Sequence, residues 1–374
     1  MISSSPTTAR RTEAARSFAA ALAEVRRAVD RELADWIAAR RRAVAATAPG
    51  AAELVDEVAR LVASGGKRLR PALVLFTYRA CGGREEGASL RLALATELLH
   101  TYLLVHDDIM DHAATRRALP TAHAELAARH RRRGWAGDAE DFGRSAAILV
   151  GDLAHTWAAE LSRPDPATGA RAEGDPGAVG RAFDAMCDEV IAGQYLELTL
   201  PHAAEATEED LLRVLRLKSG RYTVERPIEL GALLAGAGEA ALAALRTYGR
   251  AVGEAFQLQD DVLGTFGDAD AVGKPVAGDL AEGKLTFLVF HALRLAPTAE
   301  ADRLRSALGR PDLSSSEIED AREILRASGA LAAVLAMIEE RLQAARKALD
   351  EPAVPAAGRE VLLGLVEYLE ERDR

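Results

Sequence analysis

Residues 88–111, ASLRLALATELLHTYLLVHDDIMD, carry the clearest structural pattern in the sequence. It is mostly apolar up to Val105 and rich in Ala and Leu, which are strong helix formers. Asp107 and Asp111 are four residues apart, so their carboxylates share one helix face, with Asp108 one step round. The pattern therefore predicts a long apolar helix that becomes acidic at its end.

This acidic cluster has two explanations. It could be a solvated helix end, although three like charges in one turn repel each other. It could also bind a hard cation, because Mg²⁺ prefers oxygen ligands and is usually held by one or two carboxylates plus substrate phosphates. A second pair, Asp260-Asp261, ends another apolar helical run, FQLQDD at 256–261. Two acidic helices favour a metal site of the kind built inside helical bundles.

The rest of the chain also indicates helices. Aromatic residues make up only 5% of the 374 residues and proline occurs 14 times, which favours helix over strand. The apolar periodicity predicts helices over residues 15–45, 51–63, 72–81, 88–111, 181–199, 208–217, 219–236, 239–265, 283–295, 315–349 and 357–371. We expect an all-α protein with a flexible N-terminal tail, 1–14, and a single domain, 15–374. The Gly-, Pro- and Asp-rich residues 163–180 should form an exposed loop.

Composition also limits the possible binding partners and the cellular location of the protein. The net charge of −10 argues against nucleic-acid binding. The sequence contains no run of about 18 uncharged apolar residues, so we expect no stable membrane insertion. Two cysteines, Cys81 and Cys187, cannot build a disulfide framework, so a cytoplasmic location is the simplest expectation.

Basic residues form a third feature. Lys67 and Arg70 lie three apart in GGKRLRP, 65–71, which follows a glycine turn and opens a helix. Helix N-termini favour anions, and Lys and Arg bind phosphates. Any one of these side chains alone is more often a solvated surface charge. Further candidate phosphate ligands stand beside acidic clusters or turns: Arg116, Arg117, Lys218, Lys274 and Lys284.

At these motifs the chain resembles the trans-isoprenyl diphosphate synthases, the polyprenyl synthetase family, over about residues 50–300. The motifs that are similar to those of the family are GGKRLRP (65–71), LLHTYLLVHDDIMDHAATRR (98–117), GQYLEL (193–198), LKSG (217–220), FQLQDDVLGTFGD (256–268), GKP (273–275) and EGK (282–284). Three positions depart from the family pattern. Glu197 replaces Asp, Ser219 replaces Thr, and Gly264 replaces the last Asp of the second aspartate-rich motif.

The resemblance implies a Mg²⁺-dependent prenyltransferase with the isoprenoid synthase fold, helices around a deep central cavity, acting as a homodimer. It would join isopentenyl diphosphate to an allylic diphosphate and release pyrophosphate. The metal ligands, for up to three ions, would be Asp107, Asp111 and Asp260, with Asp108 and Asp261 beside them. The allylic diphosphate would contact Arg116, Lys218 and Lys274, with Lys284 a further substrate-binding candidate. Isopentenyl diphosphate would be held by Lys67, Arg70, His100 and Arg117. Ser219 and Gln257 would present dipoles to the allylic cation.

Two other functions remain open. A terpene cyclase also ionises a diphosphate, but such enzymes typically carry an Asn/Ser/Glu metal motif and lack GGKRxRP. A non-catalytic subunit of a heteromeric synthase would resemble the family but lose its aspartates, and both pairs are present here.

Product length is predicted from the residues before Asp107. In the family, the residue five before the first aspartate often closes the chain cavity, and here it is Tyr102, followed by Leu103. An aromatic fifth position, a non-aromatic fourth and no insertion in DDIMD resemble the geranylgeranyl (C20) type. Farnesyl diphosphate (C15) is the alternative, and C25 is also open. On an ideal helix, however, Tyr102 lies about 140° from Asp107, whereas Leu103 shares its face better.

Overall fold

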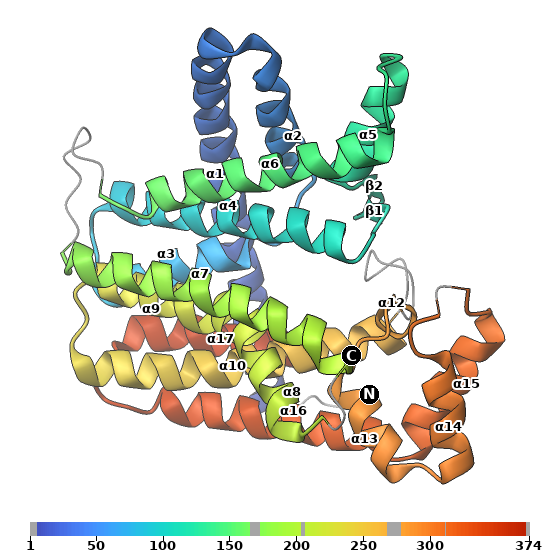
Figure 1. Ribbon diagram of the computed structural model, residues 1–374. Helices are drawn as coiled ribbons and strands as arrows, with labels where there is room; N and C mark the ends of the chain where they lie inside the picture. Colours follow the sequence, from blue (N-terminus) through green and yellow to red (C-terminus); the bar gives the residue numbers. More distant parts are fainter. Residues whose placement is uncertain (1–5, 165–172, 203–205, 268–277, 311, 372–374) are drawn as a thin grey trace. The chain divides into compact units, whose positions relative to one another are not determined.

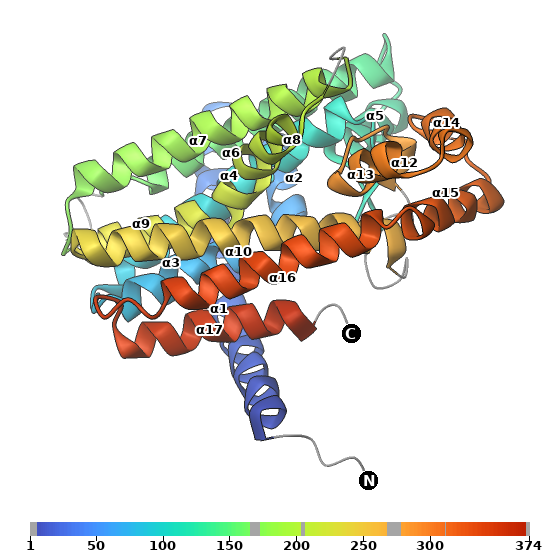
Figure 2. The ribbon, with the colours of Figure 1, turned by 90° about the horizontal axis from the view of Figure 1, so that it is seen from below.

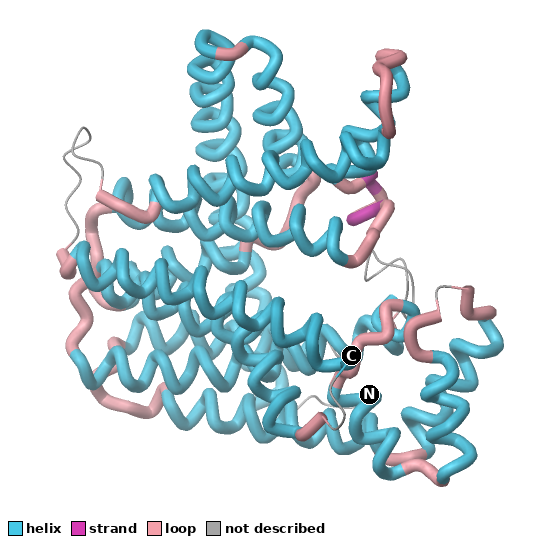
Figure 3. Tube along the Cα trace, viewed as in Figure 1, coloured by secondary structure: helices cyan, strands magenta, loops and turns pink. Residues whose placement is uncertain are grey.

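The computed structural model describes residues 6–164, 173–202, 206–267, 278–310 and 312–371. Helices make up 81% of the described residues, which confirms the predicted all-α class (Figure 3). The helices are α1 (Pro6–Thr47), η1 (Pro49–Ala51), α2 (Ala52–Ala63), α3 (Leu69–Ala80), α4 (Glu86–Met110), α5 (Ala122–Arg132), α6 (Ala139–Leu161), α7 (Pro176–Thr199), η2 (Leu200–His202), α8 (Glu208–Val214), η3 (Leu215–Glu225), α9 (Arg226–Leu234), α10 (Glu239–Phe266), α12 (Gly278–Ala281), α13 (Phe287–Leu295), α14 (Thr298–Ala307), α15 (Ser315–Ala327), α16 (Ala330–Ala348) and α17 (Ala356–Glu371). The described strands are β1 (Thr115–Arg116) and β2 (Leu119–Pro120), which form one antiparallel hairpin.

The described chain packs as two compact units. The N-terminal unit comprises residues 17–180 and 230–236, and the C-terminal unit comprises the described parts of 1–16, 181–229 and 237–374. In the N-terminal unit, α4 packs along α6, and the two helices run side by side in Figure 1. Gly151 allows this close approach, because a Cβ there would lie 2.4 Å from the His106 ring. The acidic end of α4 is thereby fixed against α6.

In the C-terminal unit, α10 is the central element. It packs against η3 and α16, and Figure 2 shows α16 running beside it. Its apolar residues Val252, Ala255 and Leu258 are almost completely buried. The Tyr248 hydroxyl donates to the Leu362 carbonyl at 2.7 Å, which ties α17 to α10. The second acidic pair thus lies on a helix anchored by packing along its length.

Several predicted helix boundaries were wrong. Residues 315–349 form two helices, because Gly329 adopts the left-handed conformation, with φ of 85°, before α16. The predicted break at Lys218 is absent, since η3 continues through it as a π-helix. Helices α5 and α6 occupy a region where the periodicity predicted none. Helix α1 already begins at Pro6.

The predicted loop 163–180 is described in part. Residues 165–172 lie outside the described ranges, and α7 begins at Pro176. The single-domain boundaries stay a prediction. Within the described residues, no helix is long and apolar enough to cross a membrane.

Candidate functional site

The first acidic cluster closes helix α4. The Asp111 amide donates to the Asp107 carbonyl at 2.8 Å, so the last turn is intact. Arg116 binds both preceding carboxylates, through Nε to Asp108 at 2.7 Å and Nη2 to Asp107 at 3.2 Å. Burial raises the pKa of Asp108 to about 6, and the charges of Asp107 and Asp111 add to this, although Arg116 opposes it. Burial of Asp108 therefore outweighs the stabilisation of its charge by Arg116.

A short hairpin carries both arginines of the motif. Strand β1 ends at Arg116, and Arg117 and Ala118 form the two-residue turn, with φ of 52° and 60°. Two consecutive positive φ angles define the mirror-image turn that suits hairpins, but they strain residues other than glycine. The Thr121 hydroxyl donates to the Ala113 carbonyl at 2.8 Å and closes the base of the hairpin. The hairpin thus folds back to bring Arg116 to the acidic cluster.

The basic motif lies close to this hairpin. The Arg117 guanidinium donates to the Gly65 carbonyl, and a Cβ on Gly66 would lie 3.2 Å from the same guanidinium. Burial, followed by the charges of Arg70 and Arg117, lowers the pKa of His100 well below its ordinary value. His100 is therefore neutral at pH 7. One pocket is lined by residues of α2, α4 and the hairpin, among them Glu97, His100, Asp108, Arg116 and Arg117.

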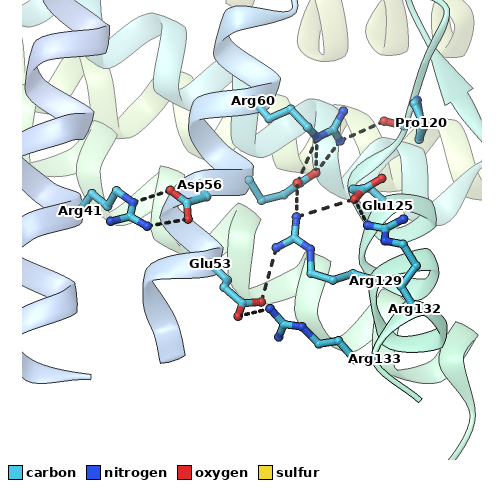
Figure 4. Close-up of polar contacts among 10 residues, drawn as sticks. Arg41, Glu53, Asp56, Arg60, Pro120, Glu125, Arg129, Arg132 and Arg133 are labelled. Carbon is cyan, nitrogen blue, oxygen red and sulfur yellow. Dashed lines mark hydrogen bonds and ion pairs between the residues drawn. The ribbon is translucent and has the colours of Figure 1, made fainter. Parts of the chain in front are cut away.

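A network of ion pairs braces this pocket from the side of α2 (Figure 4). Glu57 is completely buried and accepts two hydrogen bonds from Arg60 Nε at 3.0 Å. Arg60 Nη2 also donates to the Pro120 carbonyl at 3.0 Å. Arg129 of α5 lies 3.7 Å from Glu57. These contacts join α2, α5 and the strand that follows Arg117.

Of the predicted chain-length residues, Tyr102 lies on the side of α4 that meets α6. Its ring contacts His106 edge-on and His155 at a tilt, with centroid distances of 4.6 and 4.9 Å. A Cβ on Gly151 would lie 3.5 Å from the Tyr102 ring. Leu103 is half-buried. Helix α4 is continuous through these residues, so Tyr102 and Asp107 point in different directions around the helix axis. The Tyr102 ring packs against α6.

The second acidic cluster lies on α10 in the C-terminal unit. Burial raises the pKa of Asp261 well above its ordinary value, and Asp279, Asp260 and Glu197 add to this. Gln257 Nε2 opposes the shift by donating to the Asp261 carboxylate at 2.8 Å. Four carboxylates, those of Asp261, Asp279, Asp260 and Glu197, thus influence one another, and a bound cation would relieve the repulsion on Asp261.

Two of the candidate basic residues in this unit form ion pairs with glutamates. Lys218 on η3 pairs with Glu197, and Lys284 pairs with Glu282. Ser219 is half-buried on the same π-helix as Lys218. Lys274 lies outside the described residues. Asp279 fills the space beside Gly264, since a Cβ there would meet its carboxylate at 3.1 Å.

The donor chemistry of both clusters fits Mg²⁺. All candidate ligands are carboxylate oxygens, and the carboxyls of Asp108 and Asp261 have raised pKa values chiefly because they are buried, with neighbouring carboxylates adding to the shift. Among the described residues, no group of three or more potential ligands surrounds one point. Mg²⁺ sites that bind phosphates commonly take one or two protein carboxylates and complete the shell with water and phosphate oxygens.

Sequence reasoning missed Arg60, Arg68, Glu97 and Asp279, which support the candidate residues. Glu97 and Glu57 are buried carboxylates on otherwise apolar helix faces. A charge at such a position requires a partner, and that signal could have been used. The partner itself could not be read from the sequence, because Arg68 contacts Glu97 across 29 positions.

Comparison with known proteins identifies the family. The Polyprenyl synthetase family pattern matches residues 52–325. Geranylfarnesyl diphosphate synthase of Aeropyrum pernix is 34% identical over 317 residues, covering 83% of this chain and 92% of that protein. Geranylgeranyl diphosphate synthase of Mycobacterium tuberculosis is 33% identical over 290 residues, covering 77% and 76%.

Solved structures agree with these sequence matches. Geranylgeranyl pyrophosphate synthase of Corynebacterium glutamicum, crystallised with isoprenyl diphosphate and magnesium, superposes with a TM-score of 0.87 at 32% identity, covering 93% of this chain and 99% of that one. The resemblance and the enzyme class predicted from the sequence are thereby confirmed. The chain belongs to the polyprenyl synthetase family of prenyltransferases.

Proposed function

We propose that the protein condenses isopentenyl diphosphate with allylic diphosphates head to tail and forms geranylgeranyl diphosphate. Its family membership establishes the prenyltransferase class, and enzymes of this family generally depend on Mg²⁺. The observation that carries the assignment is the pocket of the N-terminal unit. It combines arginines, a neutral His100 and the buried Asp108, so a cationic anion site adjoins an acidic cluster.

Two sets of residues would recognise the two diphosphates. Asp107, Asp111 and Asp260 would hold up to three Mg²⁺ ions, with Asp108 and Asp261 supporting them. Bound Mg²⁺ would neutralise the diphosphate as the allylic carbon–oxygen bond breaks. Arg116 already donates hydrogen bonds to Asp107 and Asp108. It would contact the same diphosphate, together with Lys218, Lys274 and Lys284.

Isopentenyl diphosphate would bind without metal. Lys67, Arg70 and Arg117 would supply the positive charge, and neutral His100 would add a hydrogen bond. Ser219 and Gln257 would direct their dipoles to the allylic cation. After the new carbon–carbon bond forms, the released pyrophosphate would accept the proton, so no side-chain base is required. An apolar cavity among the helices would keep the growing chain from water.

Product analysis tests this function. Purified protein is incubated with farnesyl diphosphate, isopentenyl diphosphate and Mg²⁺, and the products are dephosphorylated and separated by length. A C20 product is expected. A product that stops at C15, or that extends to C25 as the name of the Aeropyrum relative indicates for that enzyme, would correct the length. A cyclic hydrocarbon formed without isopentenyl diphosphate would identify a terpene cyclase, and no turnover would favour a non-catalytic subunit.

We also propose a cytoplasmic homodimer. Both cysteines are free, which suits a reducing compartment. Large apolar side chains of the N-terminal unit are exposed, among them Ile148 and Leu149 on α6 at 44% and 54% and Met110 at 40%. Exposed apolar groups of this kind commonly mark contacts between proteins. Light scattering should give twice the chain mass of 39.8 kDa, and Leu149→Glu should weaken the dimer. A monomeric wild type would exclude it.

A further inference from the structure

Arg68 differs from its neighbours in the basic motif, because its side chain is turned into the protein. Only 2% of the side chain is exposed. Nε donates to Asp30 Oδ1 of α1 at 2.7 Å, Nη1 donates to Glu97 of α4, and Nη2 donates to the Val62 carbonyl of α2 at 2.5 Å. All three guanidinium nitrogens thus have partners, and each partner comes from a different helix.

The backbone of Arg68 is held in an unfavourable conformation. Its φ of 53° lies in the left-handed region, directly before α3 begins at Leu69. A residue other than glycine remains in this region only when its surroundings compel it. Gly65 and Gly66 precede it with φ of 91° and 147°. The side-chain contacts of Arg68 therefore fix the turn that displays Lys67 on one side and starts the helix of Arg70 on the other.

The same contacts control charge in the pocket. Glu97 lines the pocket, and an uncompensated carboxylate there would repel a diphosphate. The pKa of Arg68 remains above its ordinary value, because Glu97 and Asp30 outweigh the opposing effect of burial. Arg117 also feels the charge of Glu97. With Arg68 in place, the charge of Glu97 is neutralised from inside the protein.

We infer that Arg68 is a positioning residue for the isopentenyl diphosphate site: through Asp30, Glu97 and Val62 it shapes the turn between α2 and α3 and neutralises the carboxylate that lines the pocket. This rests on the proposed function, which places isopentenyl diphosphate beside Lys67, Arg70 and Arg117. Arg68 itself does not touch the ligand, so its loss should affect one substrate selectively.

The test compares two arginines that each pair with two carboxylates, Arg68 and Arg226. Arg68→Lys keeps the charge but loses the planar fork that reaches three partners. We expect the KM for isopentenyl diphosphate to rise about tenfold, with the allylic KM within about twofold and kcat within about threefold of wild type. Arg226→Lys is the control, because Arg226 likewise contacts two carboxylates: it donates to Glu189 at 2.9 and 2.6 Å and to Glu229. It should lower stability without selecting between the substrates.

A milder variant guards against misfolding of Arg68→Lys. Asp30→Asn removes the charge of the partner on α1 but keeps an acceptor oxygen, and it should raise the same KM by about two- to threefold. Equal changes in both KM values, or the same selectivity in Arg226→Lys, would overturn the inference. Binding of isopentenyl diphosphate in EDTA gives an independent measure, and its Kd should rise about tenfold in Arg68→Lys. If wild type binds this ligand but does not turn it over, the proposed function fails while the positioning role is still tested.

Discussion

The two acidic clusters differ in how their negative charge is balanced. In the first, Arg116 reaches both Asp107 and Asp108. In the second, the described hydrogen-bond donor to Asp261 is the neutral amide of Gln257, and Asp279 and Asp260 add negative charge. Gln257 does not offset the burial of Asp261, so we expect a bound cation to stabilise the ionised form of this carboxylate.

Removal of one carboxylate from either cluster should abolish most turnover. Asp107→Ala and Asp260→Ala are each expected to lower kcat by two or more orders of magnitude, because each removes a proposed Mg²⁺ ligand that stabilises the leaving diphosphate. Steady-state assays over a range of Mg²⁺ concentrations measure this. Gly264→Asp is the control and should be tolerated, since the added Cβ meets the end of one flexible side chain, that of Asp279. Near-normal turnover by Asp107→Ala would contradict the metal role.

Tyr102 should limit product length. Its ring is held between His106 and His155, so it is a rigid obstacle whose displacement would be costly. Tyr102→Ala is expected to shift the products of farnesyl diphosphate elongation beyond C20, as separated by chromatography. Leu103→Ala serves as the neighbouring comparison. Products of unchanged length from Tyr102→Ala would place chain-length control on other residues.

At the scale of elements, the π-helix η3 is the most unusual feature. It spans Leu215–Glu225 and carries both Lys218 and Ser219. Three glycines make room for it. A Cβ on Gly193 would lie 2.3 Å from the Lys218 amide nitrogen, one on Gly253 would lie 2.3 Å from the Gly220 carbonyl oxygen, and one on Gly249 would lie 2.7 Å from the Glu225 Cα. Long π-helices are rare and often occur at functional sites.

These contacts predict that glycine-to-alanine substitutions at two positions change the stability of the protein in opposite directions. Gly253→Ala should destabilise the protein by about 1–3 kcal/mol, because the methyl group overlaps the backbone of η3. Gly180→Ala in α7 should stabilise it by about 0.5–1 kcal/mol, because no atom lies within 4 Å of the added Cβ and Ala is the better helix former. Urea unfolding of both variants gives the comparison. A stabilising Gly253→Ala would show that η3 can move away from α10.

The sequence predicted individual helices better than the contacts that join them. The helix over 88–111 and the acidic end of α4 follow from local composition and spacing, and the structure has that helix at Glu86–Met110. The π-helix could not be predicted, because it depends on glycines of α7 and α10 that approach η3 in space. The same holds for Arg68, whose partners Asp30 and Glu97 are far away in sequence. Local pattern therefore identified the candidate ligands but not the residues that orient them.

At the scale of the whole molecule, the two packing units divide the chain at unusual places. Their boundaries fall after Arg16, Gly180, Glu229 and Gly236. The first three positions lie inside described helices, α1, α7 and α9, and Gly236 lies between α9 and α10. Separate domains are normally joined by exposed linkers that few contacts cross. Neither unit is a continuous segment, so neither could be excised without cutting helices.

This arrangement predicts a single cooperative unfolding transition. Local melting of one unit would break α1, α7 and α9 in mid-helix and expose their backbone groups, so the two units should unfold together. Far-ultraviolet circular dichroism and tryptophan fluorescence are suitable probes. Trp36 and Trp157, whose ring centroids lie 5.3 Å apart, report on the N-terminal unit. Circular dichroism follows the helices of both units. Coincident midpoints in urea are expected, and Gly253→Ala, a change in the C-terminal unit, should lower both midpoints equally. A fluorescence midpoint unaffected by Gly253→Ala would instead define two independently folding domains.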